Sequence, residues 1–279
     1  MERRDFIRTA LGAVAGGALL PGLAAAEWRG RADRLRAIGL QLYTVRTAMA
    51  ADVEGTLAAV AAIGYREVEF AGLFGRSPRD VRAMLGRHGL VAPSSHVAVP
   101  AAMDEWKRDL DDALVLGQSY IVCPWIDEKD RTTDGLKRVA ARFNAAGAAA
   151  KQAGLQFAYH NHDFEFTPVD GRLPYDLLLA ECDRSLVKME IDIYWMVNGG
   201  QDPLAYLARD PSRFPMVHAK DRTADGKMAD VGAGRIDFPK ILGAFERAGL
   251  THCFVERDDA PQPMASARAS FAYLDRLTF

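Results

Sequence analysis

The feature that most constrains this sequence is a repeated alternation of helical and apolar segments. A stretch with helical character closes on a glycine, and a short apolar stretch follows; Ala58–Ile63, Gly64 and Tyr65–Phe70 are one example. Glycine is favoured just past a helix because it adopts the left-handed backbone conformation without steric cost. Strands that alternate with helices are joined by crossovers, so the pattern predicts a parallel sheet.

Eight strands are expected from this alternation. They are Ile38–Tyr43, Tyr65–Phe70, Leu90–Ser94, Tyr120–Trp125, Leu155–His160, Leu186–Asp192, Met216–Lys220 and Cys253–Glu256. Roughly 250 residues is the usual size of an eight-unit barrel, and the pattern predicts a single-domain α/β fold, the (β/α)8 TIM barrel. A doubly wound open sheet fits the alternation too, but it normally carries a Gly-rich phosphate loop, which this sequence lacks.

The N-terminal segment 1–26 has the layout of a cleaved signal peptide. Met1–Arg8 is basic and contains paired arginines, Thr9–Ala26 carries no charge, and small residues at its end offer a cleavage site. The arginine pair resembles a twin-arginine signal, which predicts use of that export machinery and a periplasmic location. A membrane anchor is the alternative, but the run is short and poor in Leu and Ile. The barrel domain is therefore expected to span 27–279.

Charge and cysteine content narrow the choice of partners. The formal net charge of −2 gives no basic footprint for nucleic acid or an anionic membrane. Cys123 and Cys253 lie in apolar runs and are expected to be buried, and Cys182 forms no CxxC motif with them. The expected partner is a small molecule, and a homo-oligomer is compatible with the sequence.

Polar side chains gather where the expected strands end, which is where a parallel barrel places its active site. Four of the six histidines lie at these ends, together with carboxylates from strands two, six and eight. The ends carry Glu69, His96, His160, His162, Asp192, His218 and Glu256, with Glu165, Trp195, Lys220 and Arg222 close behind.

A set of imidazoles and carboxylates at one barrel mouth would resist burial unless a cation sat among them. This donor set suits Mn²⁺, Zn²⁺ or Co²⁺ better than Mg²⁺ or Ca²⁺. Each residue also has a structural interpretation: His218 as a hydrogen-bonded core residue, Asp192 as a turn cap, and Glu256 as the partner of an arginine. The combination of strand ends indicates a site for one divalent metal.

The sequence resembles the sugar phosphate isomerase/epimerase superfamily, the xylose-isomerase-like barrels. The resemblance is carried, in order, by Ile38–Arg46, Gly64–Glu69, Ser95–His96, Tyr159–His162, Ile191–Trp195, Val217–Asp221 and Phe254–Glu256. It implies a divalent metal bound by residues from strands five to eight. Asp192, His218 and Glu256 match that pattern.

Two positions depart from the family pattern. His160 stands where glutamate is usual, so either His160 is a ligand, or Glu165 reaches back, or the fourth ligand is missing. Trp195 stands where histidine is frequent. Both departures resemble the branch with inosose dehydratase-like proteins and lyases of 3-keto-glycosides.

The resemblance implies proton transfer beside the ketone of a keto-sugar or keto-polyol, aided by the metal. Returning the proton gives an isomerase or epimerase, and expelling a β-oxygen gives a dehydratase or lyase. The predicted acid–base residues are His162, Glu165 and Lys220. The predicted sugar contacts are Glu69, His96, Trp195 and Arg222, with Tyr43 and Trp125 as apolar walls.

Three other classes are alternatives to an isomerase or lyase. A DNA-repair endonuclease of the same barrel type is opposed by the charge balance and the export signal. A non-catalytic periplasmic sugar-binding barrel would bind no divalent metal. In the third class, the polar residues at the strand ends stabilise the fold and have no role in binding or catalysis.

Overall fold

Short buried strands alternate with helices along the chain, as the sequence pattern predicts. The computed structural model describes residues 33–100 and 103–279, so the expected signal peptide lies outside the described residues. The strands of the main sheet are β1 (Gly39–Gln41), β2 (Glu67–Phe70), β3 (Val91–Ser95), β4 (Tyr120–Cys123), β5 (Gln156–His160), β6 (Val187–Asp192), β7 (Met216–Ala219) and β10 (His252–Val255).

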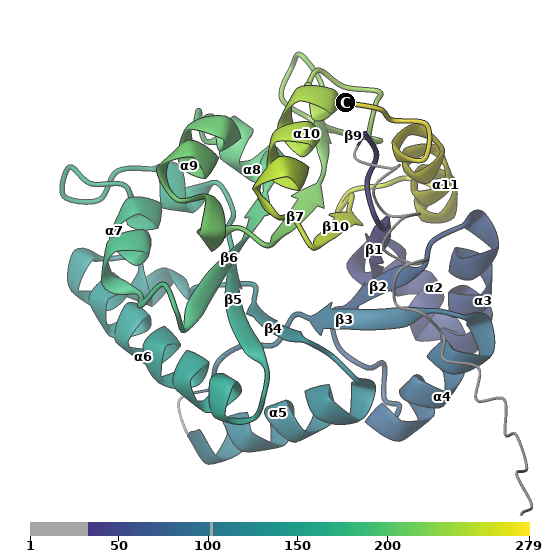
Figure 1. Cartoon of the computed structure of the whole chain (residues 1–279), viewed down its shortest axis with the longest axis horizontal. Helices are drawn as coiled ribbons and strands as arrows, with labels where there is room; N and C mark the ends of the chain where they lie inside the picture. The colour runs from purple at the N-terminus through teal and green to yellow at the C-terminus, as the bar shows by residue number, and fades with distance from the viewer. Residues whose placement is uncertain (1–32, 101–102) are drawn as a thin grey trace, which may run out of the picture. The chain divides into compact units, whose positions relative to one another are not determined.

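These eight strands form a nearly closed parallel barrel (Figure 1). Their order is β3-β2-β1-β10-β7-β6-β5-β4, and the neighbours pair in parallel. The first and last strands of that order meet at a single parallel bridge between His96 and Val122, beside a hydrogen bond of 2.8 Å from Val97 N to Val122 O. The predicted (β/α)8 fold is confirmed.

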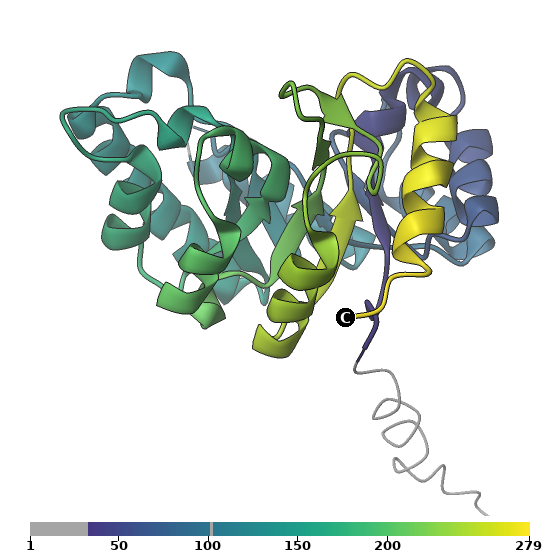
Figure 2. The same ribbon diagram turned by 90° about the horizontal axis from the view of Figure 1, so that it is seen from above.

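Helices surround the barrel on the outside (Figures 1 and 2). They are α2 (Arg46–Ala51), α3 (Val53–Ile63), α4 (Pro78–His88), α5 (Met103–Leu116), α6 (Thr133–Gln152), α7 (Pro174–Glu181), α8 (Ile193–Asn198), α9 (Pro203–Arg209), α10 (Phe238–Ala248) and α11 (Pro263–Leu274). Short 3-10 turns are η1 (Leu42–Val45), η2 (Glu128–Asp130), η3 (Phe164–Phe166) and η4 (Pro211–Arg213), and β8 (Asp221–Arg222) pairs antiparallel with β9 (Met228–Ala229). No helix within the described ranges is long and apolar enough to cross a membrane.

Two strands end two residues earlier than predicted, for local reasons. β1 stops at Gln41 because its side-chain oxygen accepts from Tyr43 N at 3.0 Å and starts the η1 turn. β4 stops at Cys123, before a proline, which has no N–H to donate to a sheet. Both changes turn the following aromatic residues, Tyr43 and Trp125, out of the sheet and toward the barrel mouth.

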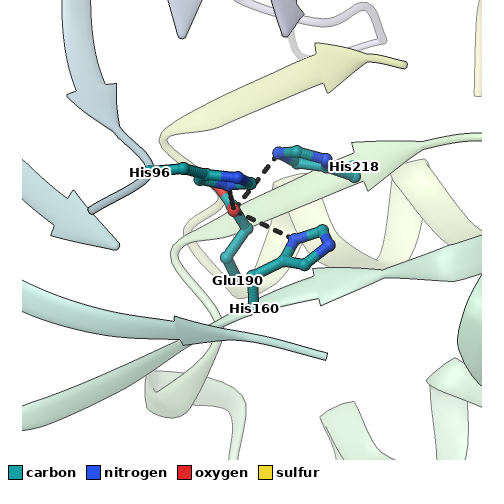
Figure 3. A group of neighbouring side chains, drawn as sticks. All are labelled: His96, His160, Glu190 and His218. Atoms are coloured by element: carbon teal, nitrogen blue, oxygen red, sulfur yellow. Dashed lines mark hydrogen bonds and ion pairs between the residues drawn. The ribbon is translucent and has the colours of Figure 1, made fainter. Parts of the chain in front are cut away.

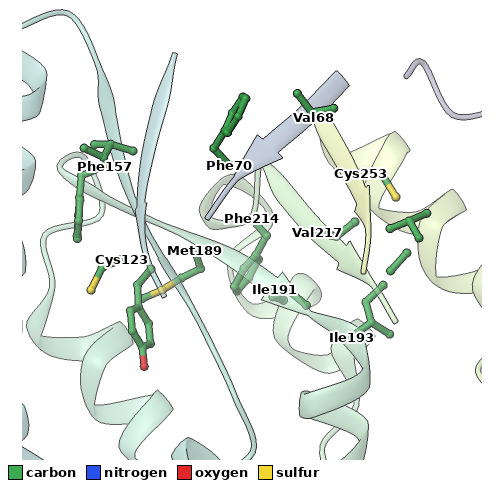
Figure 4. Close-up of a cluster of buried hydrophobic side chains, with 14 of the residues drawn as sticks. Val68, Phe70, Cys123, Phe157, Met189, Ile191, Ile193, Phe214, Val217 and Cys253 are labelled. Carbon is green, nitrogen blue, oxygen red and sulfur yellow. The ribbon is translucent and has the colours of Figure 1, made fainter. Parts of the chain in front are cut away.

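The strands divide their side chains between two apolar layers because alternate residues face opposite sides of a sheet. The outer layer lies between the strands and the helices and includes Val68, Phe70, Ile191 and Val217 (Figure 4). Its formation removes large apolar side chains from water, and each fully buried one stabilises the fold by about 1.5–3 kcal/mol. The three cysteines are buried and free, as predicted for Cys123 and Cys253.

A smaller apolar cluster fills the middle of the barrel. It consists of Val122, Ala158, Met216 and Phe254, all fully buried. A Cβ atom at position 39 would lie 2.3 Å from the Phe254 ring, so β1 needs glycine where it passes this cluster. Two residues further along their strands, Ala158, Met216 and Phe254 are followed by His160, His218 and Glu256. The period of two therefore places these three polar residues on the same inner face, directly above the apolar cluster.

Candidate metal centre

Four buried residues at the carboxyl ends of neighbouring strands form a group that we term the upper quartet. It contains His160 at the end of β5, Asp192 at the end of β6, His218 in β7 and Glu256 just after β10. One potential ligand atom from each lies within 4.8 Å of the others. The structure thus brings together the four residues predicted as metal ligands.

The two carboxylates of the upper quartet are held by their surroundings. Asp192 caps α8, since its Oδ1 accepts from Trp195 N at 2.8 Å, and its backbone N donates to Asn161 Oδ1 at 3.1 Å. Its Oδ2 makes an ion pair and has no well-aligned hydrogen bond within the described chain. Glu256 Oε2 lies 2.8 Å from His218 Nδ1. One oxygen of each carboxylate is therefore directed at the same small space.

The ammonium group of Lys220 lies beside this space. Its Nζ is 3.1 Å from Asp192 Oδ2, 2.8 Å from Glu256 Oε2 and 3.1 Å from Asp258 Oδ1. Burial alone would lower the pKa of Lys220, but these three carboxylates raise it well above its usual range. Lys220 is therefore a permanent cation that contacts two members of the upper quartet.

A second group, which we term the lower tier, lies next to the upper quartet and consists of Glu69, His96 and Glu190. Glu190 Oε2 is 2.9 Å from His96 Nε2 and 3.2 Å from both His160 Nδ1 and His218 Nε2 (Figure 3). Glu69 Oε2 lies 2.7 Å from His218 Nε2 and 3.2 Å from His96 Nε2. Both carboxylates of the lower tier thus contact His96 and at least one histidine of the upper quartet.

Glu69 was predicted to contact a sugar, but the structure buries it completely. Its oxygens accept from Gln41 Nε2 at 2.8 Å and from Ser94 Oγ at 2.6 Å. Glu190 was not assigned any role from the sequence. A signal for it existed, because Glu190 and Asp192 are two residues apart in a buried strand and so face the same side.

Electrostatics within the lower tier depend on its histidines. Burial and the Glu69 charge would raise the pKa of Glu190, but the His218 charge and a hydrogen bond from His160 hold it at about 2. Burial would lower the pKa of His96, yet the Glu69 charge and hydrogen bonds to both carboxylates raise it to about 9. Positive charge is therefore needed here to keep the carboxylates ionised.

Glu165 does not join the upper quartet. Its carboxylate accepts from the Tyr159 hydroxyl and, at 3.0 Å, from His162 N. Burial raises the pKa of Glu165 to about 7. Of the two candidates for the strand-five ligand, His160 is the one that lies among Asp192, His218 and Glu256. The acid–base role predicted for Glu165 stays a prediction.

A cavity of about 520 Å³ opens above the upper quartet. Its lining includes His96, His160, His162, Lys220, Glu256 and Asp258, with Tyr43 and Trp125 at the sides. The two aromatic side chains are 42% and 48% exposed, respectively. A volume of this size is typical of small-molecule sites. Tyr43 and Trp125, which are predicted to form apolar walls of the site, do line this cavity.

His162 contributes a neutral imidazole to this cavity. Its ring packs against Trp125, with ring centres 4.8 Å apart, and against Trp195 at 5.6 Å. Burial and the Lys220 charge lower the pKa of His162 to about 3. Within the part of the chain that the structure describes, His162 Nδ1 has no hydrogen-bond partner. His162 thus lines the cavity with a ring whose Nδ1 is buried and, among the described residues, unpaired.

Arg222, predicted as a sugar contact, lies elsewhere. It lines a separate cavity of about 280 Å³ with Asp202 and Arg235, and its Nε donates to Asn198 Oδ1 at 3.2 Å. Trp195 stays near the mouth, with its ring centre 5.8 Å from Lys220 Nζ. The roles given to both residues from the sequence stay predictions.

The residues present fit a divalent cation. The upper quartet offers two imidazole nitrogens and two carboxylate oxygens, a number and type of ligands suited to Zn²⁺, Mn²⁺ or Co²⁺. The incompletely bonded Asp192 Oδ2 is the atom that such a cation would satisfy. Lys220 already supplies positive charge beside the same oxygens.

Comparison with known proteins gives three kinds of match. A sequence model of the xylose isomerase-like TIM barrel family matches residues 57–277. A solved structure from Parabacteroides distasonis, described as a sugar phosphate isomerase/epimerase, has a TM-score of 0.77 and 29% sequence identity, over 86% of this chain and 97% of that one. A structure of the IOLI protein with a binding zinc atom has a TM-score of 0.68 at 16% identity, over 85% and 97% of the two chains, which shows likeness of fold.

Curated relatives match a smaller part of the chain. An inosose dehydratase of Lacticaseibacillus casei is 28% identical over 171 residues, which is 53% of this chain and 57% of the relative. The chain thus spans little more than half the length of the curated relatives it matches.

Proposed function

The chain belongs to the xylose isomerase-like TIM barrel family, and from this premise we propose that it is a divalent-metal-dependent enzyme acting on a keto-sugar or keto-polyol. The reaction we favour is isomerisation or epimerisation by proton transfer beside the ketone. The observation that carries the proposal is that the upper quartet borders a 520 Å³ cavity through His160 and Glu256, with His162 and Lys220 beside them.

A divalent cation bound by the upper quartet would polarise the ketone oxygen of the substrate and lower the barrier to removal of the adjacent proton. The side chains around it supply orientation and proton transfer. Lys220 presents a buried positive charge to a substrate oxygen, and Tyr43 and Trp125 offer exposed aromatic faces to the apolar side of a sugar ring. The cavity then holds the substrate between a charged floor and apolar walls.

His162 is the acid–base residue that the geometry supports best. It lines the cavity, it packs against Trp125 and Trp195, and burial together with the Lys220 charge keeps its imidazole neutral. A neutral imidazole accepts a proton that a carboxylic acid or an ammonium cannot. Lys220 is the opposite case, since it keeps its proton and acts as a donor to oxygen.

A dehydratase or lyase is the second candidate, and the similarity to inosose dehydratases favours it. The same residues suffice for that outcome. After His162 removes the proton, the Lys220 ammonium would donate a hydrogen bond to the departing β-oxygen, and the proton held by His162 would pass to that oxygen as it leaves. The substrate would then be an inosose or a 3-keto-glycoside.

Deuterium exchange tests the shared step. The protein, loaded with Mn²⁺, Zn²⁺ or Co²⁺, is incubated in D₂O with a panel of ketoses, an inosose and a 3-keto-glucoside, and NMR follows loss of the proton beside each ketone. Exchange with an unchanged carbon skeleton indicates an isomerase or epimerase, whereas a new enone absorbance or release of the aglycone indicates a lyase. Exchange no faster than with the His162→Ala variant, for every compound and metal, would refute the proposal.

A further inference from the structure

We propose that Glu190 is a positioning residue that makes His160 of the upper quartet coordinate through Nε2, while Glu190 and Glu69 together leave Nδ1 as the coordinating nitrogen of His218. The inference rests on the proposed function, because it assumes that the upper quartet holds a divalent metal. It concerns Glu190, to which no role was assigned from the sequence, and it specifies which atoms bind.

The argument begins with a single oxygen atom. Glu190 Oε2 lies 3.2 Å from His160 Nδ1 and 3.2 Å from His218 Nε2 (Figure 3). The other nitrogen of each ring faces the upper quartet: His160 Nε2 is 3.7 Å from Asp192 Oδ2, and His218 Nδ1 is 2.8 Å from Glu256 Oε2. One carboxylate oxygen thus contacts both rings on the side away from the proposed metal.

The chemistry of imidazole turns this contact into a choice of tautomer. A neutral imidazole carries one proton, and the nitrogen that binds a metal must be the unprotonated one. The protonated nitrogen then donates to an acceptor, and a carboxylate in that place fixes the ring orientation and strengthens the ligand. Carboxylate oxygens at His160 Nδ1 and at His218 Nε2 favour the tautomers with protons on those nitrogens, which leaves His160 Nε2 and His218 Nδ1 to bind the metal.

The sheet holds Glu190 in this position. It is fully buried in β6, and in the sheet register it stands opposite His160 of β5 and Met216 of β7. Its contact with His160 is therefore a cross-strand pair, set by the same pairing that closes the barrel. If the Glu190 carboxylate moved away from the histidines, its charge would stay buried without a partner, beside the apolar cluster.

The two histidines depend on Glu190 to different degrees. His218 Nε2 has a second carboxylate, Glu69 Oε2, at 2.7 Å. For His160 Nδ1, Glu190 is the acceptor that the described part of the chain provides. Loss of the Glu190 carboxylate should therefore release His160 and leave His218 oriented.

Three variants separate positioning from a general structural role. Glu190→Met keeps the bulk of the side chain but has no acceptor, and Glu190→Gln keeps a carbonyl oxygen that accepts from His160. The matched control is Glu67→Met, since Glu67 also accepts from a histidine inside the barrel, His252 at 2.8 Å, but at the other end of its strand. Circular dichroism establishes that each variant is folded.

Metal affinity is measured by competition with a chromophoric chelator, using Zn²⁺ alone. Glu190→Met should bind Zn²⁺ about 10- to 100-fold more weakly than the unaltered protein, the usual effect of losing such an acceptor. Glu190→Gln should restore most of that loss, and Glu67→Met should bind as the unaltered protein does. Equal affinity in Glu190→Met and the unaltered protein would overturn the inference.

The coordinating atoms are read from the unaltered protein, so the test does not depend on a variant that folds. With ¹⁵N-labelled histidine and bound ¹¹³Cd²⁺, NMR should show metal coupling to His160 Nε2 and His218 Nδ1, and a proton on the other nitrogen of each ring. Glu190→Met should change the His160 signals and leave those of His218. Coupling to His160 Nδ1 or His218 Nε2 would mean that His96, Glu190 and these nitrogens hold the cation instead, and would overturn the inference.

Failure of the proposed function gives a different result. If the unaltered protein binds no divalent metal, both proposals fall together. If it binds a metal through the expected nitrogens yet exchanges no proton in any keto compound, the proposed function fails and the role of Glu190 stands. If exchange occurs and the opposite nitrogens coordinate, only the role of Glu190 fails.

Discussion

Replacement of Lys220 by methionine should have opposite effects on the stability of the metal-free protein and on its affinity for metal. The Lys220 ammonium is fully enclosed and lies 2.8–3.1 Å from oxygens of Glu256, Asp192 and Asp258. Removing one partner from a buried ion pair costs about 3–5 kcal/mol, because the remaining charges stay buried and unpaired. In the presence of a chelator, we therefore expect the free energy of unfolding of Lys220→Met to fall by roughly this amount.

The same change should tighten metal binding. Lys220 Nζ contacts one oxygen from each of two proposed ligands, so a divalent cation in the upper quartet would lie within several ångströms of the ammonium. At an effective dielectric constant of about 20, two unit charges 4 Å apart repel by about 4 kcal/mol, and screening and side-chain movement reduce this figure. We expect at least a tenfold gain in affinity, which corresponds to about 1.4 kcal/mol.

Thermal and urea unfolding with chelator, and chelator competition for Zn²⁺, measure the two effects. Lys188→Met is a suitable control, because Lys188 belongs to the same barrel but donates to Ser212 O at 3.0 Å, away from the upper quartet. The electrostatic argument is wrong if Lys220→Met is as stable as the unaltered protein in chelator, or if it binds Zn²⁺ more weakly. Either result would mean that the Lys220 ammonium does not neutralise the carboxylates to which a metal would bind.

Further predictions concern other parts of the chain. His218→Ala should lose more than tenfold in metal affinity and nearly all proton exchange, as measured by chelator competition and NMR; full retention of metal would end its assignment as a ligand. The pKa of Glu165 is about 7 in the folded protein and about 4.3 in the unfolded chain, so its contribution to stability is present below about pH 4 and is lost as pH rises through 7. In urea titrations from pH 5 to 8, the free energy of unfolding of Glu165→Gln should rise by up to about 3 kcal/mol relative to that of the unaltered protein. Parallel curves for the two proteins would contradict this. Trp125→Ala should raise KM several-fold with little change in kcat, because an exposed wall contributes binding rather than chemistry. Mass spectrometry of the periplasmic protein should find a mature chain that begins near residue 27, and an intact N-terminus there would refute the signal peptide.

Depth along a strand explains why the two tiers have different chemistry. The upper quartet borders the cavity through His160 and Glu256, and the lower tier reaches it through His96, whereas Glu69 and Glu190 are fully buried. These two buried carboxylates stay ionised because imidazoles from the ends of β3, β5 and β7 surround them. The barrel interior therefore changes from apolar to charged within one or two residues of each strand.

Local sequence rules account for the fold and for the upper quartet. Glycine caps and apolar runs predict eight strand–helix units, and a period of two places His160, His218 and Glu256 on the inner face where their strands end. Because all parallel strands of a barrel run the same way, residues at their ends must meet. The convergence of His218 and Glu256 with Asp192 was thus expected from the sequence pattern, whereas only the structure showed that His160, and not Glu165, joins them.

Closure of the barrel decided the rest. The contacts of Glu190 with His96 and of Glu69 with His218 join strands that are not neighbours in the sheet, so no pattern within one segment predicts them. Glu165 lies outside the upper quartet because its carboxylate accepts a hydrogen bond from the Tyr159 hydroxyl. Arg222 lies in the β8–β9 hairpin and lines another cavity. Periodicity determines which face a side chain occupies, whereas its partners across the barrel depend on strand order, stagger and side-chain length, which exist only in the folded chain.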